Sequence, residues 1–207
     1  EALIIAMEEH QRYFPIVDKS GNLINKFCFV SNIESNEPEA VIDGNERVIR
    51  PRFADAKFFW EEDLKKNLES YLDPLSSVIF QTKLGTQAEK IARVTHLADL
   101  IADSIGADRT LVARAARLNK SDLISNMVQE FPELQGTMAR YYALAQKEDE
   151  VVANALEEVY WPRFAGDKLP QTKEAQALSI AERLDTIVGI FSIGEIPTGS
   201  RDPYSLR

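Results

Sequence analysis

The chain has 207 residues, of which 44% are hydrophobic and 28% charged, and its net charge is −9. A chain of this size buries a sizeable core, whereas its acidic excess excludes nonspecific nucleic-acid binding through overall charge and leaves any RNA contact to local basic groups. No apolar run approaches the ~18 residues of a membrane-spanning helix, so no membrane contact is expected. The sole cysteine, Cys28, lies in the apolar run FCFV. We expect it to be buried as a small hydrophobe in a cytoplasmic protein.

The first predicted elements are a helix and a hairpin. Residues 1–13 have helical character and lack an initiator Met, which indicates a piece of a longer protein. Residues 15–33 predict two strands joined by a turn at 18–22, because apolar β-formers flank a stretch of turn residues.

One long helix is predicted to follow the hairpin. Ser35 or Asn36 is expected to cap it, and Pro38 suits its first turn. Pro51 lacks a backbone donor and predicts a kink or a split. Gly44 predicts a break or a close packing contact.

After residue 85 nearly every segment predicts a helix. The first of these helices should stop at Gly106, and Asp108 should cap the next. Apolar spacing predicts further helices at about 121–129, 133–146, 149–160 and 174–191. We therefore expect a mainly α fold with two parts: a small α+β part over residues 1–85 and an all-helical domain over 86–207.

The sequence contains no phosphate-binding glycine loop, no nucleophile elbow and no metal-ligand spacing of histidines. Its two histidines, His10 and His96, are expected to be surface or packing residues. No catalytic residue and no cofactor is therefore expected in these 207 residues.

Three helical segments resemble, in their order, the metal-dependent phosphohydrolases of the His-Asp (HD) type. They are EKIARVTHLADLIA, AARLNKSDL and IAERLDTI. In such enzymes imidazoles and carboxylates from separate helices hold a metal that lowers the pKa of a bound water. The corresponding positions here are occupied by Lys90 (the first His), Asn119 and Lys120 (the His-Asp doublet) and Glu182 (the final Asp). Because a cationic lysine repels a divalent metal, we expect no metal site. The two aspartates that remain nearby are expected to be solvated or to cap helices: Asp122 and Asp185.

Longer motifs resemble one family more specifically. They are HQRYFPIVDKSGNL, FVSNIE, GNERVIRPRFADAKFFWEEDLK, FPELQGTMARYYA, PRFAGDKLP and ERLDTIVGIFSIGEIPTGSRDPYSLR. Together they are similar to the middle of the beta subunit of the bacterial two-subunit glycyl-tRNA synthetase, over essentially all 207 residues. The resemblance implies a central HD-like helical domain with a degenerate metal site and no aminoacylation site.

The same resemblance implies partners and a role. The segment is expected to contribute to tRNA(Gly) binding and to subunit assembly. ATP, Mg and glycine are expected on the alpha subunit, which is the implied protein partner.

Two groups of basic side chains are candidate RNA contacts, because RNA affinity comes mainly from cations that face phosphates. They are Arg47, Arg50 and Arg52 on the long helix, and Arg114, Arg117 and Lys120, which step by three along another helix and so should lie on one side of it. The alternative for each residue is a solvated face paired with neighbouring carboxylates. For the whole chain, the alternatives are a metal-dependent phosphohydrolase and a helical scaffold without a nucleic-acid role.

Overall fold

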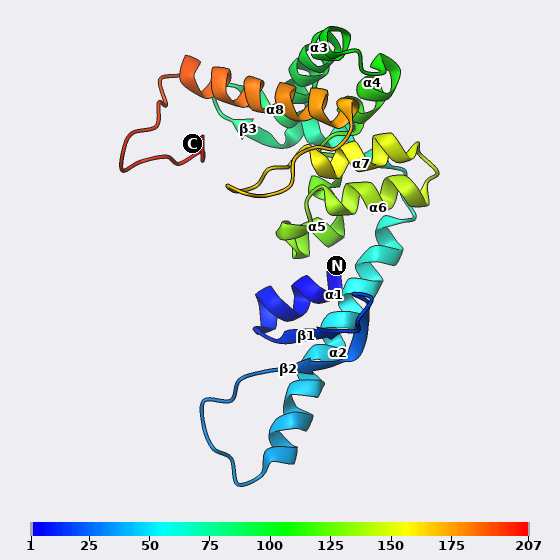
Figure 1. Ribbon diagram of the computed structural model, residues 1–207, viewed down its shortest axis with the longest axis vertical. Helices are drawn as coiled ribbons and strands as arrows, with labels where there is room; N and C mark the ends of the chain where they lie inside the picture. Colours follow the sequence, from blue (N-terminus) through cyan, green and yellow to red (C-terminus); the bar gives the residue numbers. More distant parts are fainter. Residues whose placement is uncertain (1, 207) are drawn as a thin grey trace. The chain divides into compact units, whose positions relative to one another are not determined.

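A computed structural model of the chain describes residues 2–206 apart from the side chain of His10 (Figure 1). Glu1, where the predicted first helix begins, and the predicted role of the His10 side chain lie outside the described part. The described chain is mainly helical, as predicted, and its strands form small antiparallel hairpins. None of its helices between residues 2 and 206 is long and apolar enough to cross a membrane.

The chain forms two compact units that differ from the predicted parts. The first contains the residues up to Lys65 together with 126–134, and the second contains 66–125 and the residues from Gln135 onward. The division thus falls at Lys65 rather than near residue 85, because the short elements that follow Lys65 pack against the helices of the second unit.

The first unit is built on one long helix and a hairpin. Its elements are α1 (Ala2–Ile5), the π-helical turn η1 (Ala6–His10), β1 (Phe14–Val17), β2 (Leu23–Cys28), α2 (Pro38–Asp63), α5 (Asn126–Glu130) and η5 (Pro132–Leu134). The predicted hairpin is confirmed: β1 pairs antiparallel with β2, and Asp18 accepts backbone hydrogen bonds from Ser20 and Asn22 in the turn. Cys28 is exposed at the end of β2, so the prediction that it is buried is wrong.

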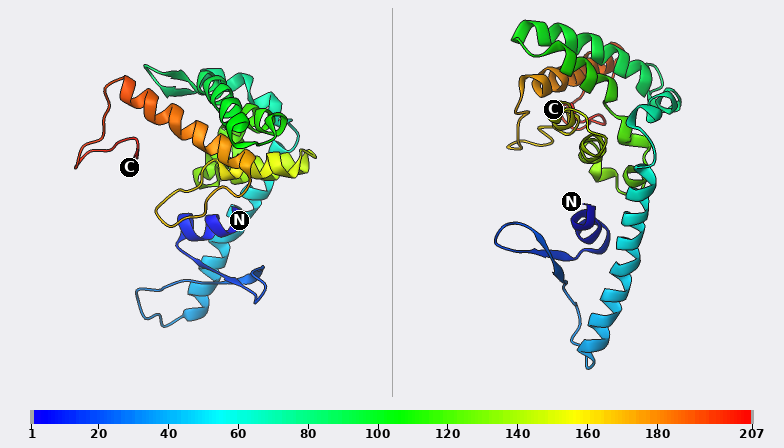
Figure 2. Two further views of the ribbon diagram at one scale, coloured as in Figure 1. Left: turned by 45° about the horizontal axis from the view of Figure 1, so that its top comes forward. Right: turned by 90° about the vertical axis from the view of Figure 1, so that its right-hand side faces the viewer.

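The hairpin and α2 are neighbouring elements of the first unit (Figure 2), and a small apolar core joins them. Met7, Tyr13 and Ile49 are buried there, and the rings of Tyr13 and Phe27 stack with their centroids 4.8 Å apart. This core joins η1, the hairpin and α2, which follow one another along the chain.

Helix α2 runs unbroken from Pro38 to Asp63. Its N-cap, Pro51 and Gly44 each differ from what the sequence predicts. Glu37 is its N-cap residue and its side chain makes no capping bond, while the Ser35 hydroxyl accepts from the Glu37 amide. Pro51 is exposed and does not split the helix, because water can satisfy the carbonyl that loses its donor on an exposed face. A Cβ on Gly44 would meet nothing within 4 Å, so Gly44 marks neither a break nor a close contact.

The buried end of α2 holds α5 in place. Asp63 is 1% exposed, and its carboxylate accepts from the backbone amides of Asn126 and Met127, each at 2.9 Å. These bonds satisfy orphan donors at the start of α5.

The second unit is a helical bundle with one short hairpin. Its elements are η2 (Leu68–Tyr71), η3 (Asp73–Ser77), β3 (Ile79–Gln81), β4 (Gly85–Thr86), α3 (Gln87–Ile105), α4 (Arg109–Leu118), η4 (Ser121–Ile124), α6 (Thr137–Ala145), α7 (Glu150–Glu158) and α8 (Lys173–Ser192). Two predicted boundaries are confirmed. Gly106 ends α3 with φ +66°, and the Asp108 side chain accepts from the Thr110 and Leu111 amides at the start of α4. The helix predicted at 121–129 is instead divided into η4 and α5.

The core of the second unit lies among α3, α4, α7 and α8, with α3 and α8 packed against each other (Figure 1). Both helices bury small residues at a four-residue spacing, Ala98 and Ala102 on α3 and Ala177 and Ala181 on α8. Residues four apart lie on one helix face, and small side chains there allow close approach. This packing brings the first turn of α3 beside the middle of α8.

Candidate functional site

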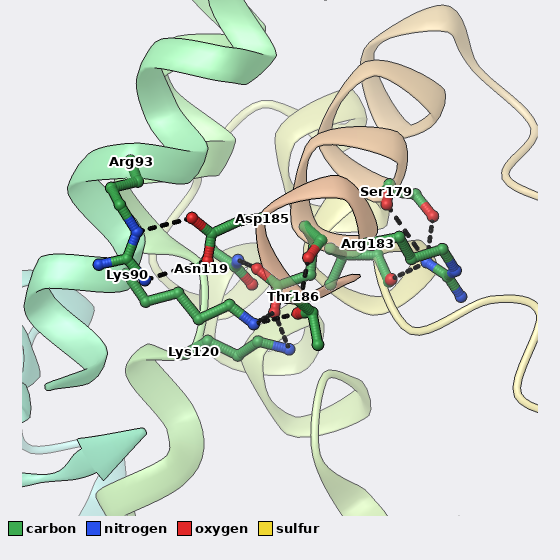
Figure 3. Close-up of polar contacts among 10 residues, drawn as sticks. Lys90, Arg93, Asn119, Lys120, Ser179, Arg183, Asp185 and Thr186 are labelled. Carbon is green, nitrogen blue, oxygen red and sulfur yellow. Dashed lines mark hydrogen bonds and ion pairs between the residues drawn. The ribbon is translucent and has the colours of Figure 1, made fainter. Parts of the chain in front are cut away.

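Four positions that the sequence places at a degenerate metal site lie together in the structure (Figure 3). Lys90 comes from the first turn of α3, Glu182 from α8, and Asn119 with Lys120 from the end of α4. Lys90 Nζ lies 2.7 Å from Glu182 Oε1, and Lys120 Nζ lies 3.6 Å from the same oxygen. Asn119 Nδ2 donates to Glu182 Oε2 at 3.3 Å. We call these four residues the Glu182 cluster.

The backbone at the end of α4 sets the position of Lys120. Helix α4 ends at Leu118, and Lys120 has φ +65°, in the left-handed region. This region is uncommon for residues with a side chain and needs support from the surroundings. Lys120 Nζ lies 3.6 Å from the centroid of the Tyr160 ring as well as beside Glu182. A cation–π contact and an ion pair therefore supply that support.

Burial and charge act in opposite directions within the Glu182 cluster. Burial raises the pKa of Glu182, but the ammonium groups of Lys120 and Lys90 outweigh it, so the pKa is lowered and the carboxylate is ionised at neutral pH. Burial lowers the pKa of Lys90, and the charge of Glu182 opposes that shift. The Lys90 ammonium also donates to Thr186 Oγ1 at 2.7 Å and lies 4.1 Å from the centroid of the Phe80 ring.

Asp185 and Asp122 have different environments beside this cluster. Asp185 is buried and is held by the Arg93 guanidinium, with Nε and Nη2 at 2.6 and 3.1 Å from its two oxygens. Asp122 accepts from the amides of Gly136 (2.7 Å) and Ala139 (3.2 Å) at the start of α6. Asp122 thus caps a helix, as expected, whereas Asp185 pairs with the partly exposed Arg93, which was not expected. Burial raises the pKa of Asp122.

The donor set of the Glu182 cluster does not suit a divalent metal. A protonated lysine offers three donors and no lone pair, so Lys90 and Lys120 cannot be ligands while they are charged. The oxygens left within the cluster belong to Glu182 and Asn119, and two ammonium groups already compensate the carboxylate. Across residues 2–206, with the side chain of His10 excepted, no group of three or more His, Cys, Asp or Glu side chains is arranged to hold a metal.

The three candidate RNA contacts on α2 all pair with carboxylates. Arg47 lies 2.6 Å from Asp43 and Arg50 lies 3.0 Å from Glu46, each four residues along the same helix. The third, Arg52, lies 3.5 Å from Glu130 of α5. Arg47 and Arg50 remain 77% and 75% exposed, so these two are surface ion pairs.

The other candidate group does not form a row. Arg114 binds the carboxylates of both Glu69 and Glu148. Arg117 is 63% exposed and lies 3.7 Å from Glu69. Because α4 ends before Lys120, that lysine leaves the helix and is buried in the Glu182 cluster. The expectation that the three lie on one side of a helix is therefore wrong.

A cavity beside the Glu182 cluster was not predicted. It has a volume of about 560 Å³ and lies between the segment that follows α7, one face of α8 and the last residues of the described chain. Lys120, Glu182, Arg163, Phe164 and Tyr204 are among its lining residues. The stretches PRFAGDKLP and DPYSLR supply much of this lining, but nothing in either stretch predicts that they meet.

The fold and the Glu182 cluster define a mainly helical protein whose buried carboxylate is compensated by its own lysines. Comparison with known proteins identifies the family. A family described as "Glycyl-tRNA synthetase beta subunit" matches residues 1–207, and the chain belongs to this family. The resemblance noted in the sequence is confirmed.

Individual relatives cover the chain from end to end. The glycine–tRNA ligase beta subunit of Neisseria gonorrhoeae (strain NCCP11945) is 52% identical over 207 residues. Those of Pseudoalteromonas translucida and Psychromonas ingrahamii are 54% and 55% identical over the same length. In each case the alignment covers 100% of this chain but 30% of the relative, so the chain spans about a third of these proteins.

Proposed function

We propose that this chain is the central part of a glycine–tRNA ligase beta subunit that helps to bind tRNA(Gly) and to assemble with the alpha subunit for aminoacylation in the cytoplasm. The observation that carries the proposal is the family match over all 207 residues. ATP and Mg belong, in this proposal, to the alpha subunit.

The exposed arginines support a role in RNA binding. Arg47 and Arg50 pair with carboxylates one helical turn away, and such exposed pairs contribute about 0.3–0.5 kcal/mol. An RNA phosphate can replace a partner that is held so weakly. Arg117 is similarly exposed, whereas Arg114 forms ion pairs with two carboxylates. Within the six candidates, we therefore assign phosphate contacts first to Arg47, Arg50 and Arg117.

An apolar stripe on α8 supports a role in assembly. Ile180, Leu184, Val188 and Phe191 recur at helical spacing and are 44–63% exposed. A contiguous exposed apolar surface is typical of a protein contact site. The stripe is therefore available to another part of the ligase.

The competing functions have less support. A metal-dependent phosphohydrolase needs a metal-bound water. In this chain Lys90 and Lys120 occupy positions where such an enzyme has metal ligands, and both pair with Glu182. A scaffold without a nucleic-acid role predicts no affinity for tRNA, and a binding measurement separates it from the proposal.

The test is a titration of fluorescently labelled tRNA(Gly) with the 207-residue chain, with and without the alpha subunit, at several salt concentrations. We expect binding that weakens with salt and strengthens when the alpha subunit is present. Arg117→Ala should lower the salt slope by roughly one unit if Arg117 contacts one phosphate.

The matched control is Lys57→Ala, which removes an exposed cation that pairs with Glu61 on α2 and is not a candidate contact. It should leave the slope unchanged. Equal effects of the two variants, or no tRNA binding in either the presence or the absence of the alpha subunit, would contradict the proposal.

A further inference from the structure

The cavity beside the Glu182 cluster has the size and position of a ligand site. Its volume of about 560 Å³ lies within the usual range for small-molecule pockets, roughly 300–1,000 Å³. It is closed on one side by Arg183, Thr186 and Ile187 of α8, and on another by Tyr204–Leu206. All of its walls belong to the second unit.

The charged side chains that line the cavity are mostly cationic. Among the described residues they are Lys120, Arg163 and Arg183, with Glu182 as the opposing carboxylate. Glu182 is paired with Lys120 at 3.6 Å as well as with Lys90 at 2.7 Å, so Arg163 and Arg183 are the lining cations that have no carboxylate partner within the lining. The cavity therefore has an excess of positive charge.

Arg183 lies in this cavity with neutral partners. Its guanidinium donates to the Ser179 hydroxyl at 2.6 Å (Figure 3). It also donates to the backbone carbonyls of Val159 and Pro162, each at 3.0 Å. These bonds fix the position of the side chain without neutralising it. A fixed cation at a cavity wall favours an anionic ligand.

Aromatic groups line the same cavity. Phe164 is 68% exposed and Tyr204 is 37% exposed, so both present ring surface to a ligand. The buried hydroxyl of Tyr160 has no hydrogen-bond partner within the described chain. Buried polar groups are seldom left unsatisfied, and Tyr160 is one of the residues that line the cavity.

We infer that this cavity binds one unpaired nucleotide of an RNA strand, with its phosphate held by Arg163 and Arg183 and its base against Phe164 or Tyr204. The inference deepens the proposed function and rests on it, because it names where and how tRNA is held. Cations that follow the backbone combined with aromatic rings that stack on bases are the chemistry by which proteins hold single-stranded nucleic acid. A free nucleoside monophosphate shares this chemistry, so the experiment has to separate the two sources.

The experiment uses the complete two-subunit ligase and tRNA(Gly) carrying randomly ethylated phosphates. Ethylation removes a phosphate charge, so it weakens binding wherever that phosphate is contacted. With the unmodified ligase we expect interference at a phosphate in an unpaired region that disappears in the Arg163→Ala ligase. Phe164→Ala should weaken tRNA binding roughly tenfold, the effect expected for the loss of one stacked base.

Lys168→Ala is the matched control. Lys168 is an exposed cation on the same segment that lies against the Trp161 ring, 5.3 Å from its centroid, and does not line the cavity. The variant should keep the full interference pattern. In a separate arm, adenosine 5′-monophosphate should compete with tRNA only weakly, because a single nucleotide makes only one of the many contacts that a whole tRNA makes with the ligase.

The possible outcomes separate this inference from the proposed function. If tRNA binds normally but Arg163→Ala and Lys168→Ala behave alike, the cavity inference is overturned and the proposed function stands. If adenosine 5′-monophosphate binds tightly while Arg163→Ala leaves the interference pattern intact, the cavity is a small-nucleotide site and the inference fails. If the ligase shows no tRNA binding that depends on this subunit, both fail together.

Discussion

Glu182 is the acidic centre of a cluster that is almost closed to solvent. The side chains of Lys90, Lys120 and Glu182 are 5%, 11% and 12% exposed. At such burial an ion pair contributes little net stability compared with apolar residues, but removal of one partner leaves an uncompensated charge. The consequence of a substitution therefore depends on which charge it leaves behind.

Replacement of Glu182 should be more damaging than replacement of Lys90. Glu182→Gln leaves two buried ammonium groups without a carboxylate and should lower the free energy of unfolding by about 3–5 kcal/mol. Lys90→Met leaves Glu182 paired with Lys120 and should lower it by about 1–2 kcal/mol. Urea denaturation of both variants at pH 7 measures the difference. Equal losses, or a larger loss for Lys90→Met, would show that the carboxylate does not balance both lysines.

Asp122 should make stability depend on pH in the direction opposite to that of a typical surface carboxylate. Burial raises its pKa in the folded state above the unfolded value of about 3.9. Between these two pKa values the folded chain binds more protons than the unfolded chain, so stability falls as pH rises through this window.

Asp122→Asn tests this dependence because Asn keeps an oxygen that can accept from Gly136 and Ala139 but does not titrate. The lowered pKa of Glu182 makes stability rise with pH, but it does so in both proteins and cancels in their difference. We expect the free energy of unfolding of the wild type, minus that of the variant, to decrease from about pH 4 to pH 7. A constant difference across this range is the contrary result.

At the scale of elements, the start of α6 is where three segments of the second unit meet. Asp122 of η4 accepts the Gly136 amide, and the Tyr160 ring after α7 lies against Gly136. Gly136 has φ +81°, a conformation that favours glycine. The junction therefore depends on the absence of a side chain at this position.

Gly136→Ala should destabilise the second unit by about 2–4 kcal/mol, because a left-handed conformation and overpacking each contribute. A Cβ at this position would lie 2.6 Å from Tyr160 Cδ2 and 3.1 Å from the Leu156 carbonyl oxygen. Thermal unfolding followed by circular dichroism measures the loss. A midpoint equal to that of the wild type would mean that the junction can adjust.

Gly44→Ala is the opposite case and a useful comparison. Gly44 lies inside α2, and a Cβ added there would have nothing within 4 Å of it. Alanine at this position should raise the free energy of unfolding by about 0.5–1 kcal/mol, because glycine loses more backbone entropy in a helix. Urea denaturation measures the free energy of unfolding. A decrease would contradict the open space around Gly44.

At the scale of the whole molecule, the chain spans about 30% of the length of its relatives. Its described residues hold a buried ion pair and a cationic cavity. The sequence of the chain contains no glycine-rich phosphate loop. Under the proposed function, glycine activation belongs to the alpha subunit.

The chain alone should not activate glycine. We expect glycine-dependent pyrophosphate–ATP exchange by the purified chain to remain at background, with the complete two-subunit ligase as the positive control. Exchange that depends on glycine and follows the chain through purification would place an activation site within these residues.

Local features of the fold were predictable because they depend on residues close together in the sequence. The hairpin turn rests on Asp18 and its neighbours, and the ends of helices rest on Gly106 and Asp108. The same rules failed where solvent exposure decided the outcome, as at Pro51, which lies on an exposed face of an unbroken helix.

The candidate site was predictable in its positions but not in its contacts. The resemblance to HD-type helices singled out Lys90, Asn119, Lys120 and Glu182, and these four residues do converge. That Lys120 turns away from α4 and that Arg114 is bound by Glu69 and Glu148 could not be read from helical spacing.

From sequence alone, the family, the mainly helical class and many element boundaries follow, because long motifs and short-range capping patterns carry that information. Tertiary packing decided which charges are free and which are compensated. Lys90 meets Thr186 across 96 positions, and Asn119 meets Glu182 across 63. Burial and charge pairing depend on such distant neighbours, so the Glu182 cluster and the cationic cavity beside it exist only in the folded chain.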